Sequence, residues 1–295
     1  MKETVMAGVL TWLKEQPLTA TNFLIQRQVK NPTLRERAAD WVARTRPAAD
    51  TTPGHSAAAL LESGIQPMDI VGPARAEEMR RYFEGYKVRD HYGKTPGEFL
   101  PTDAGPETHV GTFDDAVVLR APHAVEIANH PAVLSAVSSA LGARPIISSM
   151  TAWWSIPHAG AAREAELFHR DIDDWRFIKL FVYLTDVDEE SGPHAYIPGS
   201  HRSDQLREIR RYSDEEVEAA YPDKCMRICG PAGDAFLENT QGLHRGIPPR
   251  SRLRLLFQVI YSLSKSPYGP ARPIALRSDF PDLDLDPYVN QAYLK

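Results

Sequence analysis

The sequence predicts a mainly β fold with flanking α-helices, built as a sandwich or a barrel. Six apolar runs of strand length lie in its second half, at residues 145–157, 177–184, 194–197, 225–229, 235–239 and 252–263. Turns that contain Gly and Pro separate these runs, which is the pattern of an all-β sandwich or barrel. Helical patterns dominate the chain before residue 145. With 295 residues and 42% hydrophobic residues, the chain is long enough for one large core.

Residues 1–55 are expected to form a helical N-terminal extension followed by a linker. The first helix has apolar residues at helical spacing, at Val5, Val9, Trp12 and Leu13. Pro17 should end this helix, and Thr33 with Glu36 forms a capping box that would open a second one. The apolar face of the second helix would carry Leu34, Ala38, Trp41 and Val42. The role of the extension stays open between packing on the core and a subunit contact.

The main domain is expected over residues 56–264, with its barrel core at 145–263. It should begin with a helix that ends at Gly64, a short strand, and a helix opened by Pro73. Residues 88–110 predict a long loop, which we expect to form a lid or one wall of a pocket. The remaining segments are helices over 120–142, a helical or loop insertion over 204–224, and an irregular tail over 265–295.

Composition argues against several classes of function. The net charge of −5 and the pI of about 6.1 give no basic field that would attract nucleic acid. No apolar run approaches the roughly 20 residues of a transmembrane helix, and the charges that flank the apolar N-terminus favour an amphipathic helix over a signal peptide. Cys225 and Cys229 match neither a disulfide framework nor a zinc knuckle. We therefore expect a cytoplasmic protein with two reduced thiols, which binds neither nucleic acid nor a membrane.

The strongest chemical signal is a His-x-Asp pair, His169 and Asp171, beside an apolar strand. On a strand, side chains i and i+2 share one face, so the imidazole and the carboxylate would point the same way. His244 lies much later in the chain and would supply a second imidazole from a distant strand. Two His and one carboxylate on one face of an octahedron suit non-haem Fe(II). On its own, a His-x-Asp pair also fits two polar residues of a strand or loop.

Three segments together resemble the phytanoyl-CoA dioxygenase family of Fe(II)- and 2-oxoglutarate-dependent oxygenases. They are FHRDID, LTDVDEESGPHAYIPGSHR and GDAFLENTQGLHRG, and the resemblance covers residues 56–262. It implies a double-stranded β-helix, a jelly-roll or cupin-like barrel. It also implies Fe(II) held by His169, Asp171 and His244, with 2-oxoglutarate as cosubstrate and O2 as oxidant. Halogenases of this superfamily lack the carboxylate, so Asp171 favours hydroxylation or a related C–H oxidation.

The far carboxylate of 2-oxoglutarate needs a cation, and the planar guanidinium of Arg binds carboxylates in bidentate fashion. The family places this Arg on the strand after the distal His, which indicates Arg254, with Arg252 as an alternative. Both would share a strand face, and Arg254 lies deeper in the apolar strand. Lys179 on an earlier apolar strand is a further alternative, and Gln258 would face the same side as Arg254.

The substrate pocket is expected to include Trp154, Trp175 and His158, because aromatic side chains can wall an oxygenase site and exclude water. Core packing is the alternative for the tryptophans. His194 and His201 are assigned to turn structure or to hydrogen bonds around the metal ligands.

The substrate is predicted to be a small molecule, polar or amphiphilic, whose identity stays open. The competing functions on the same barrel are a metal-dependent isomerase or lyase and a non-catalytic binding protein. The oligomeric state is also open, and the N-terminal helices make a dimer conceivable.

Overall fold

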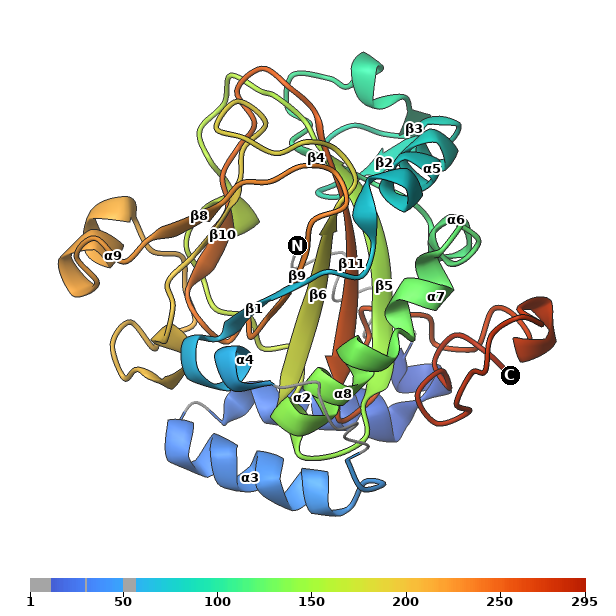
Figure 1. Cartoon of the computed structure of the whole chain (residues 1–295). Helices are drawn as coiled ribbons and strands as arrows, with labels where there is room; N and C mark the ends of the chain where they lie inside the picture. The colour runs from blue at the N-terminus through green and yellow to red at the C-terminus, as the bar shows by residue number, and fades with distance from the viewer. Residues whose placement is uncertain (1–11, 30, 50–56) are drawn as a thin grey trace.

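The computed structural model describes residues 12–29, 31–49 and 57–295, and its core is a pair of antiparallel sheets (Figure 1). The larger sheet has eight strands in the order β1-β9-β6-β11-β5-β4-β2-β3. Their bounds are β1 Ile65–Met68, β2 Val88–Asp90, β3 Glu98–Phe99, β4 Val110–Thr112, β5 Ile146–Ser155, β6 Phe177–Tyr183, β9 Ala235–Glu238 and β11 Arg254–Ser262. The smaller sheet, in the order β10-β7-β8, consists of β7 His194–Tyr196, β8 Met226–Ile228 and β10 His244–Gly246.

The predicted fold class is confirmed, because antiparallel strands form the core and helices flank them. The two sheets are not closed into a barrel. Within the described residues, β1 and β3 are the edges of the larger sheet, and neither pairs with the smaller one.

Both faces of the central strands β6, β9 and β11 are largely buried, and strand alternation assigns each residue to one of them. On β11, one face packs into the core under the helices, through Leu255, Phe257, Val259 and Tyr261. The other face lines a cavity between the sheets, through Arg254, Leu256, Gln258 and Ile260. Strand β5 follows the same rule, so that Trp154 lies in the helix-side core while Trp153 faces the cavity.

The α-helices are α2 Pro17–Gln28, α3 Pro32–Arg44, α4 Ala58–Ser63, α5 Gly72–Glu84, α6 Asp115–Leu119, α7 Ala124–Ala128, α8 Pro131–Leu141 and α9 Asp214–Ala220. Figure 1 shows α7 and α8 on one side of the larger sheet and β8 and β10 on the other. In the ranges that the structure describes, no helix combines the length and the apolar character that a membrane crossing requires.

The N-terminal helices begin at other residues than predicted. The described residues 12–15 are helical and this helix ends before Pro17, as predicted. Pro17 also begins α2, because a Pro has no N–H to leave unpaired in the first turn. Asn31 caps α3, and its side chain accepts the Leu34 N–H at 3.0 Å, so the predicted capping box of Thr33 and Glu36 is wrong. The part of the predicted helix over Val5 and Val9 lies outside the described residues.

The buried face of α3 also differs from the prediction. Leu34 and Trp41, which were expected on the apolar face, are 56% and 68% exposed. Val42 is buried as predicted, and the helix also buries Ala39 and Ala43. Small side chains let the helix approach the domain closely, so the contact surface follows Ala rather than the largest apolar residues.

Residues 88–110, predicted as a loop, contain β2, β3 and the start of β4, which extend the larger sheet at one edge. These strands are short, and β2 and β3 carry an exposed cross-strand ion pair, Arg89 with Glu98 at 2.6 Å. Their sequence therefore lacks the alternation of apolar and polar residues that would predict a strand. The tail over residues 265–295 contributes to neither sheet, yet it docks on the core. Tyr293 is 1% exposed, and its hydroxyl accepts the Met150 N–H at 2.6 Å.

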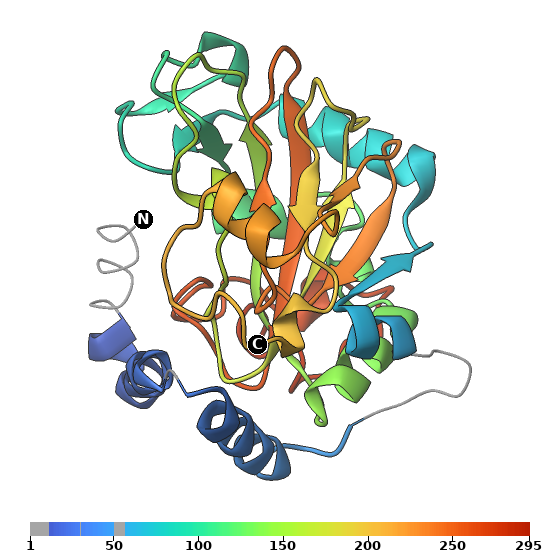
Figure 2. The ribbon, with the colours of Figure 1, turned by 90° about the vertical axis from the view of Figure 1, so that its left-hand side faces the viewer.

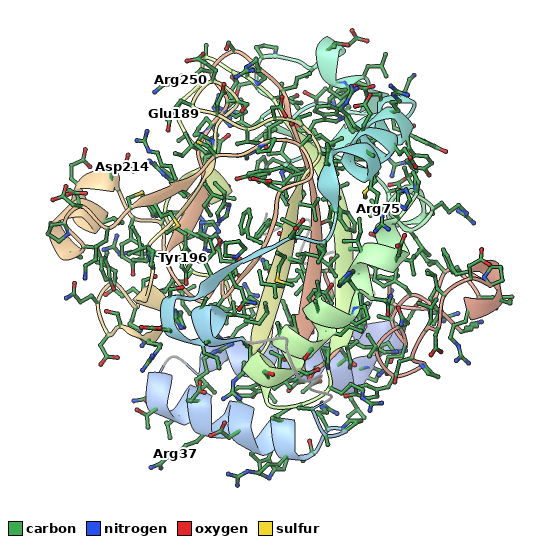
Figure 3. The ribbon with its side chains drawn as sticks, in the orientation of Figure 1. Arg37, Arg75, Glu189, Tyr196, Asp214 and Arg250 are labelled. Carbon is green, nitrogen blue, oxygen red and sulfur yellow. The ribbon has the colours of Figure 1, made fainter. Side chains whose placement is uncertain are left out.

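Tyr196 of β7 joins the smaller sheet to the start of the domain (Figure 3). Its ring packs between the sheets with Phe181 and Phe236, and its hydroxyl donates to the Asn239 carbonyl at 3.3 Å. Gly64 ends α4 with a left-handed φ of 84°, as predicted, and any Cβ at this position would collide with the Tyr196 hydroxyl.

Candidate metal centre

Three side chains from distant parts of the chain converge between the two sheets. Asp171 Oδ1 lies 3.5 Å from His169 Nε2, and Asp171 Oδ2 lies 3.2 Å from His244 Nε2. One ligand atom from each residue falls within 4.8 Å of the others, and all three residues line the same cavity. Two imidazoles and one carboxylate at this spacing can share one metal ion and leave its opposite face open.

The backbone brings these residues together without the strand that was predicted for His169 and Asp171. His169 and His244 form an isolated antiparallel bridge, in which each N–H donates to the other's carbonyl, at 3.0 and 3.1 Å. The Asp171 N–H donates to the Thr240 carbonyl at 2.9 Å. The extended backbone still places the side chains of residues 169 and 171 on one side, so the prediction of a shared face agrees with the geometry although the strand is absent.

Hydrogen bonds orient both imidazoles toward the centre. His169 Nδ1 lies 2.9 Å from the Leu167 carbonyl, and His244 Nδ1 lies 3.0 Å from the Gly242 carbonyl. A carbonyl oxygen only accepts, so Nδ1 carries the proton in both rings. Nε2 is therefore the nitrogen through which each ring can bind a metal, once it carries no proton, and the carbonyls fix the ring orientation as outer partners of metal ligands do.

The surroundings shift the pKa values of the three candidate ligands in different directions. Burial, reinforced by the neighbouring His244, lowers the pKa of His169 to about 4. Burial also opposes the charged form of His244, but the adjacent Asp171 carboxylate outweighs it and raises the pKa of His244. Burial would raise the pKa of Asp171, but Lys179 and His244 hold it well below its usual value. At a pH between the pKa of His169 and the raised pKa of His244, the metal-free centre thus combines a carboxylate, a neutral His169 and a protonated His244.

We therefore expect Fe(II) binding to release one proton from His244. The pKa of this imidazole lies above its usual value of 6.5, so below that pKa protons compete with the metal for Nε2. The affinity for Fe(II) should rise by about tenfold per pH unit and level off once His244 is neutral. Anaerobic calorimetric titration in buffers of different ionisation enthalpy measures the proton directly. An affinity that does not change between about pH 6 and about pH 8 would contradict this assignment.

A second group of potential ligands, formed by His109, His158 and Glu166, has a different geometry. His109 Nδ1 lies 2.8 Å from Glu166 Oε2, and His158 Nε2 lies 3.0 Å from Glu166 Oε1. The two rings are stacked at 3.3 Å with an angle of 19° between their planes. Nitrogen lone pairs of stacked rings run parallel and do not converge on one ion. The predicted pocket residue His158 therefore acts on the cavity indirectly, because it holds Glu166, which lines the cavity wall.

The cavity beside the candidate metal ligands has a volume of about 420 Å³, and it contains two buried cations, Arg254 and Lys179. Arg254 is 4% exposed; it donates from Nη2 to Ser155 Oγ at 3.0 Å and from Nη1 to the Gly192 carbonyl. Its Nε has no partner, and no carboxylate of the described residues pairs with the guanidinium. A buried cation without a paired counter-charge is costly, and Glu166 acts on Arg254 only through its electrostatic field, so this part of the cavity suits an anionic group.

Gly192 belongs to the Gly-Pro part of the segment LTDVDEESGPHAYIPGSHR, and its backbone conformation explains why Gly stands there. Its φ is 74°, and a Cβ at this position would overlap the Ile247 carbonyl and the backbone of Pro249. Only Gly therefore lets this turn approach the chain after β10 closely enough for its carbonyl to accept from Arg254.

Arg252, the alternative to Arg254, lies outside the cavity. Strand β11 begins at Arg254, so Arg252 belongs to the preceding turn, where its side chain is 52% exposed and pairs with Asp188. Lys179 does face the cavity, but its Nζ lies 2.7 Å from Asp171 Oδ2 and 2.8 Å from Asp173 Oδ2. Lys179 is thus paired with the candidate ligand Asp171 and with the neighbouring Asp173, and it does not lie at the Arg254 end of the cavity.

The other predicted pocket residues are distributed over both faces of the larger sheet. Gln258 faces the cavity, with its Nε2 3.4 Å from Thr151 Oγ1. Trp154 is buried in the helix-side core, and Trp175 lies under α2, where its Nε1 donates to Asn22 Oδ1 at 2.8 Å. The structure places neither tryptophan in the cavity.

Several cavity residues were missed by the sequence reasoning, namely Trp153, Phe181, Tyr268 and Asp173. Two of them carry a usable signal. Trp153 is two residues from Ser155 on β5 and so shares its face, and Ser155 pairs with Arg254 of β11. Phe181 is likewise two residues from Lys179 on β6 and shares its face. The others come from loops, whose approach to the cavity no local pattern encodes.

A model of the phytanoyl-CoA dioxygenase (PhyH) family matches residues 71–252, which include the three candidate ligands and stop just before Arg254. The chain resembles the non-heme alpha ketoglutarate dependent carbocyclase SnoK from nogalamycin biosynthesis, with a TM-score of 0.50, 18% identity, and coverage of 73% of this chain and 86% of that chain. It also resembles AviO1 from Streptomyces viridochromogenes Tue57, with a TM-score of 0.50, 15% identity, and coverage of 73% of this chain and 96% of that chain.

HygX from Streptomyces hygroscopicus, solved with nickel and 2-oxoglutarate bound, has a TM-score of 0.47 and 16% identity, and the match covers 82% of this chain and 97% of that chain. No curated protein sequence matches the chain. At these identities the solved structures establish the shared fold, a jelly-roll with flanking helices.

Proposed function

The chain belongs to the phytanoyl-CoA dioxygenase family of Fe(II)- and 2-oxoglutarate-dependent oxygenases, and we propose that it hydroxylates, or otherwise oxidises, a C–H bond of a small molecule. The observation that carries this proposal is the placement of Arg254. A buried guanidinium without a carboxylate partner shares one cavity with two imidazoles and a carboxylate at metal-ligand spacing. A metal centre that does not use 2-oxoglutarate has no need of that cation.

The donor set fits Fe(II). His169 and His244 would bind through Nε2 and Asp171 through one carboxylate oxygen, which is the arrangement of non-haem iron oxygenases with open positions. Lys179 would hold the carboxylate of Asp171 in place from the other side, since its Nζ already lies 2.7 Å from Oδ2. When bound, iron and 2-oxoglutarate supply the oxidising power, because decarboxylation of 2-oxoglutarate to succinate and CO2 is coupled to oxidation of the substrate.

Arg254 would bind the far carboxylate of 2-oxoglutarate. The Gly192 carbonyl and Ser155 Oγ fix the plane of its guanidinium, so little freedom is lost on binding. The neighbouring walls of the cavity are apolar, through Trp153, Phe181 and Leu256. They exclude water, which strengthens the ion pair and protects the reacting centre.

The test is the formation of succinate from 2-oxoglutarate under air, with and without Fe(II). We expect iron-dependent turnover, and a weak visible absorption band when Fe(II) and 2-oxoglutarate are added without oxygen. A metal-dependent isomerase, a lyase or a binding protein on the same fold would leave 2-oxoglutarate unconsumed and give no such band.

The type of oxidation needs a second measurement once a substrate is found by stimulated succinate release. SnoK is a carbocyclase on this fold, so cyclisation is the alternative to hydroxylation. Hydroxylation transfers one atom of O2 to the product, whereas ring closure between two carbon atoms or epimerisation transfers none. Labelled O2 followed by mass spectrometry of the product separates these outcomes.

A further inference from the structure

The N-terminal helices α2 and α3 lie before the region that the family model matches, yet they contact the loop that carries a candidate metal ligand. We call residues 171–176 the ligand loop; it begins at Asp171 and leads into β6. Figures 1 and 2 show both helices at one end of the sheets, where this loop runs. The contacts between them include buried and part-buried hydrogen bonds as well as surface ion pairs.

Two donors from α2 converge on one carbonyl next to Asp171. Gln26 Nε2 donates to the Ile172 carbonyl at 3.0 Å, and Arg27 Nη1 donates to the same oxygen at 2.9 Å. Gln26 is fully buried. On the other side, the Asp171 N–H donates to the Thr240 carbonyl at 2.9 Å. The backbone of the ligand residue is therefore held from both ends, once by the domain and once by α2.

Helix α3 fixes the orientation of the Gln26 amide. Arg35 donates to the Gln26 backbone carbonyl at 2.7 Å and to Gln26 Oε1 at 2.5 Å, and it also donates to the Asp174 carbonyl in the ligand loop. A guanidinium has no acceptor, so the amide oxygen must face Arg35 and the amide nitrogen must face Ile172. Arg35, Gln26 and Ile172 thus form a directed chain of hydrogen bonds that ends beside Asp171.

The same helix also supports a wall of the cavity. Arg27 Nη1 lies 3.4 Å from the Tyr268 hydroxyl, and the ring of Phe23 meets the ring of Tyr268 edge to face at 5.7 Å. Tyr268 lines the cavity that contains the metal ligands. Helix α2 therefore contacts both the ligand loop and a residue that faces the space for substrate.

We infer that the N-terminal helices are part of the active site, and that Gln26 and Arg27 are positioning residues that set Asp171 against His169 and His244. The inference rests on the proposed function in one respect, the binding of metal by Asp171. Side chains that hold metal ligands in place typically contribute 10–100-fold to metal affinity. Removing the donors of α2 should therefore weaken metal binding without unfolding the domain.

The test compares four variants of the full chain. Gln26→Leu and Arg27→Met remove the donors to Ile172 but keep the size of the side chain and its apolar stem. Arg176→Met is the matched control, because it breaks contacts between α3 and the same loop, with Asp40 at 2.8 Å and with Glu36, at the end far from Asp171. Arg27→Lys retains a charged donor and tests rescue.

Three readouts separate positioning from stability: the anaerobic Kd for Fe(II), the visible band of the complex with Fe(II) and 2-oxoglutarate, and the Tm of the metal-free protein. We expect Gln26→Leu and Arg27→Met to raise the Kd by about tenfold and to shift the band. Arg176→Met should change neither, and Arg27→Lys should restore part of the affinity. If one variant fails to fold, the other carries the same comparison.

An unchanged Kd and band in both α2 variants would overturn the inference and leave the helices a structural role only. The inference also fails if Arg176→Met weakens metal binding as much as the α2 variants do. A wild-type protein that binds neither Fe(II) nor 2-oxoglutarate would instead overturn the proposed function itself, so the two failures are distinct.

Discussion

Replacement of His169 by Ala is expected to abolish iron-dependent succinate formation. The Nε2 lone pair of His169 is one of three that face the centre, and its pKa of about 4 keeps it unprotonated at neutral pH. Loss of an outer partner alone typically costs 10–100-fold in metal affinity, so loss of the ligand itself should cost at least about 100-fold. Turnover should fall to the iron-free background, and His244→Ala should behave in the same way.

His123→Asn is a suitable control for this experiment. His123 is a surface histidine that contacts Glu78 and Glu126, at 2.8 and 3.1 Å. It has a left-handed φ of 63°, a conformation that Asn tolerates. This variant should keep wild-type iron affinity, measured anaerobically, and wild-type succinate formation. Iron-dependent turnover that survives in His169→Ala would remove His169 from the ligand set.

The second large effect is expected at Arg254, whose replacement by Met should impair the use of 2-oxoglutarate and not the binding of iron. Breaking a buried, hydrogen-bonded charge pair costs about 2–5 kcal/mol, and about 1.4 kcal/mol corresponds to a factor of ten. The KM for 2-oxoglutarate should therefore rise by at least about 30-fold. The Kd for Fe(II), measured without 2-oxoglutarate, should stay close to the wild-type value.

Arg252→Met provides a matched control two residues away. Its guanidinium is 52% exposed and pairs with Asp188 outside the cavity, so the KM for 2-oxoglutarate should change by less than about twofold. In Arg254→Met, a 2-oxo acid with an apolar tail should become a better cosubstrate relative to 2-oxoglutarate. Equal effects of the two replacements, or an effect of Arg252→Met alone, would show that Arg254 does not hold the cosubstrate.

The choice between Arg252 and Arg254 shows where sequence reasoning stops. Both residues are in phase along the apolar run at 252–263, and alternation cannot separate them. The structure begins β11 at Arg254, so only Arg254 projects from the sheet into the cavity. A strand boundary depends on where a partner strand ends, here at Ser155 of β5. That information lies about a hundred residues away in the chain.

The convergence of the three candidate metal ligands was easier to predict than their surroundings. Residue types and the i, i+2 relation suffice to put His169 and Asp171 on one side of an extended chain, whether or not it pairs as a strand. The two tryptophans of β5 were harder, because neighbours point to opposite faces and the sequence does not say which face is the cavity. The hydrogen bond between Gln26 and Ile172 joins residues 146 positions apart, and no local sequence pattern in either segment predicts it.

The size of the cavity sets a limit on how this protein can select a substrate. Its volume of about 420 Å³ lies toward the lower end of the range of about 300–1,000 Å³ for small-molecule sites, and 2-oxoglutarate must share it. A bulky substrate therefore inserts only the portion that carries the reactive C–H bond, while the rest stays outside. Such an enzyme selects its substrate by the shape of the inserted portion alone. Compounds that differ only in the parts that stay outside should therefore compete for the same protein.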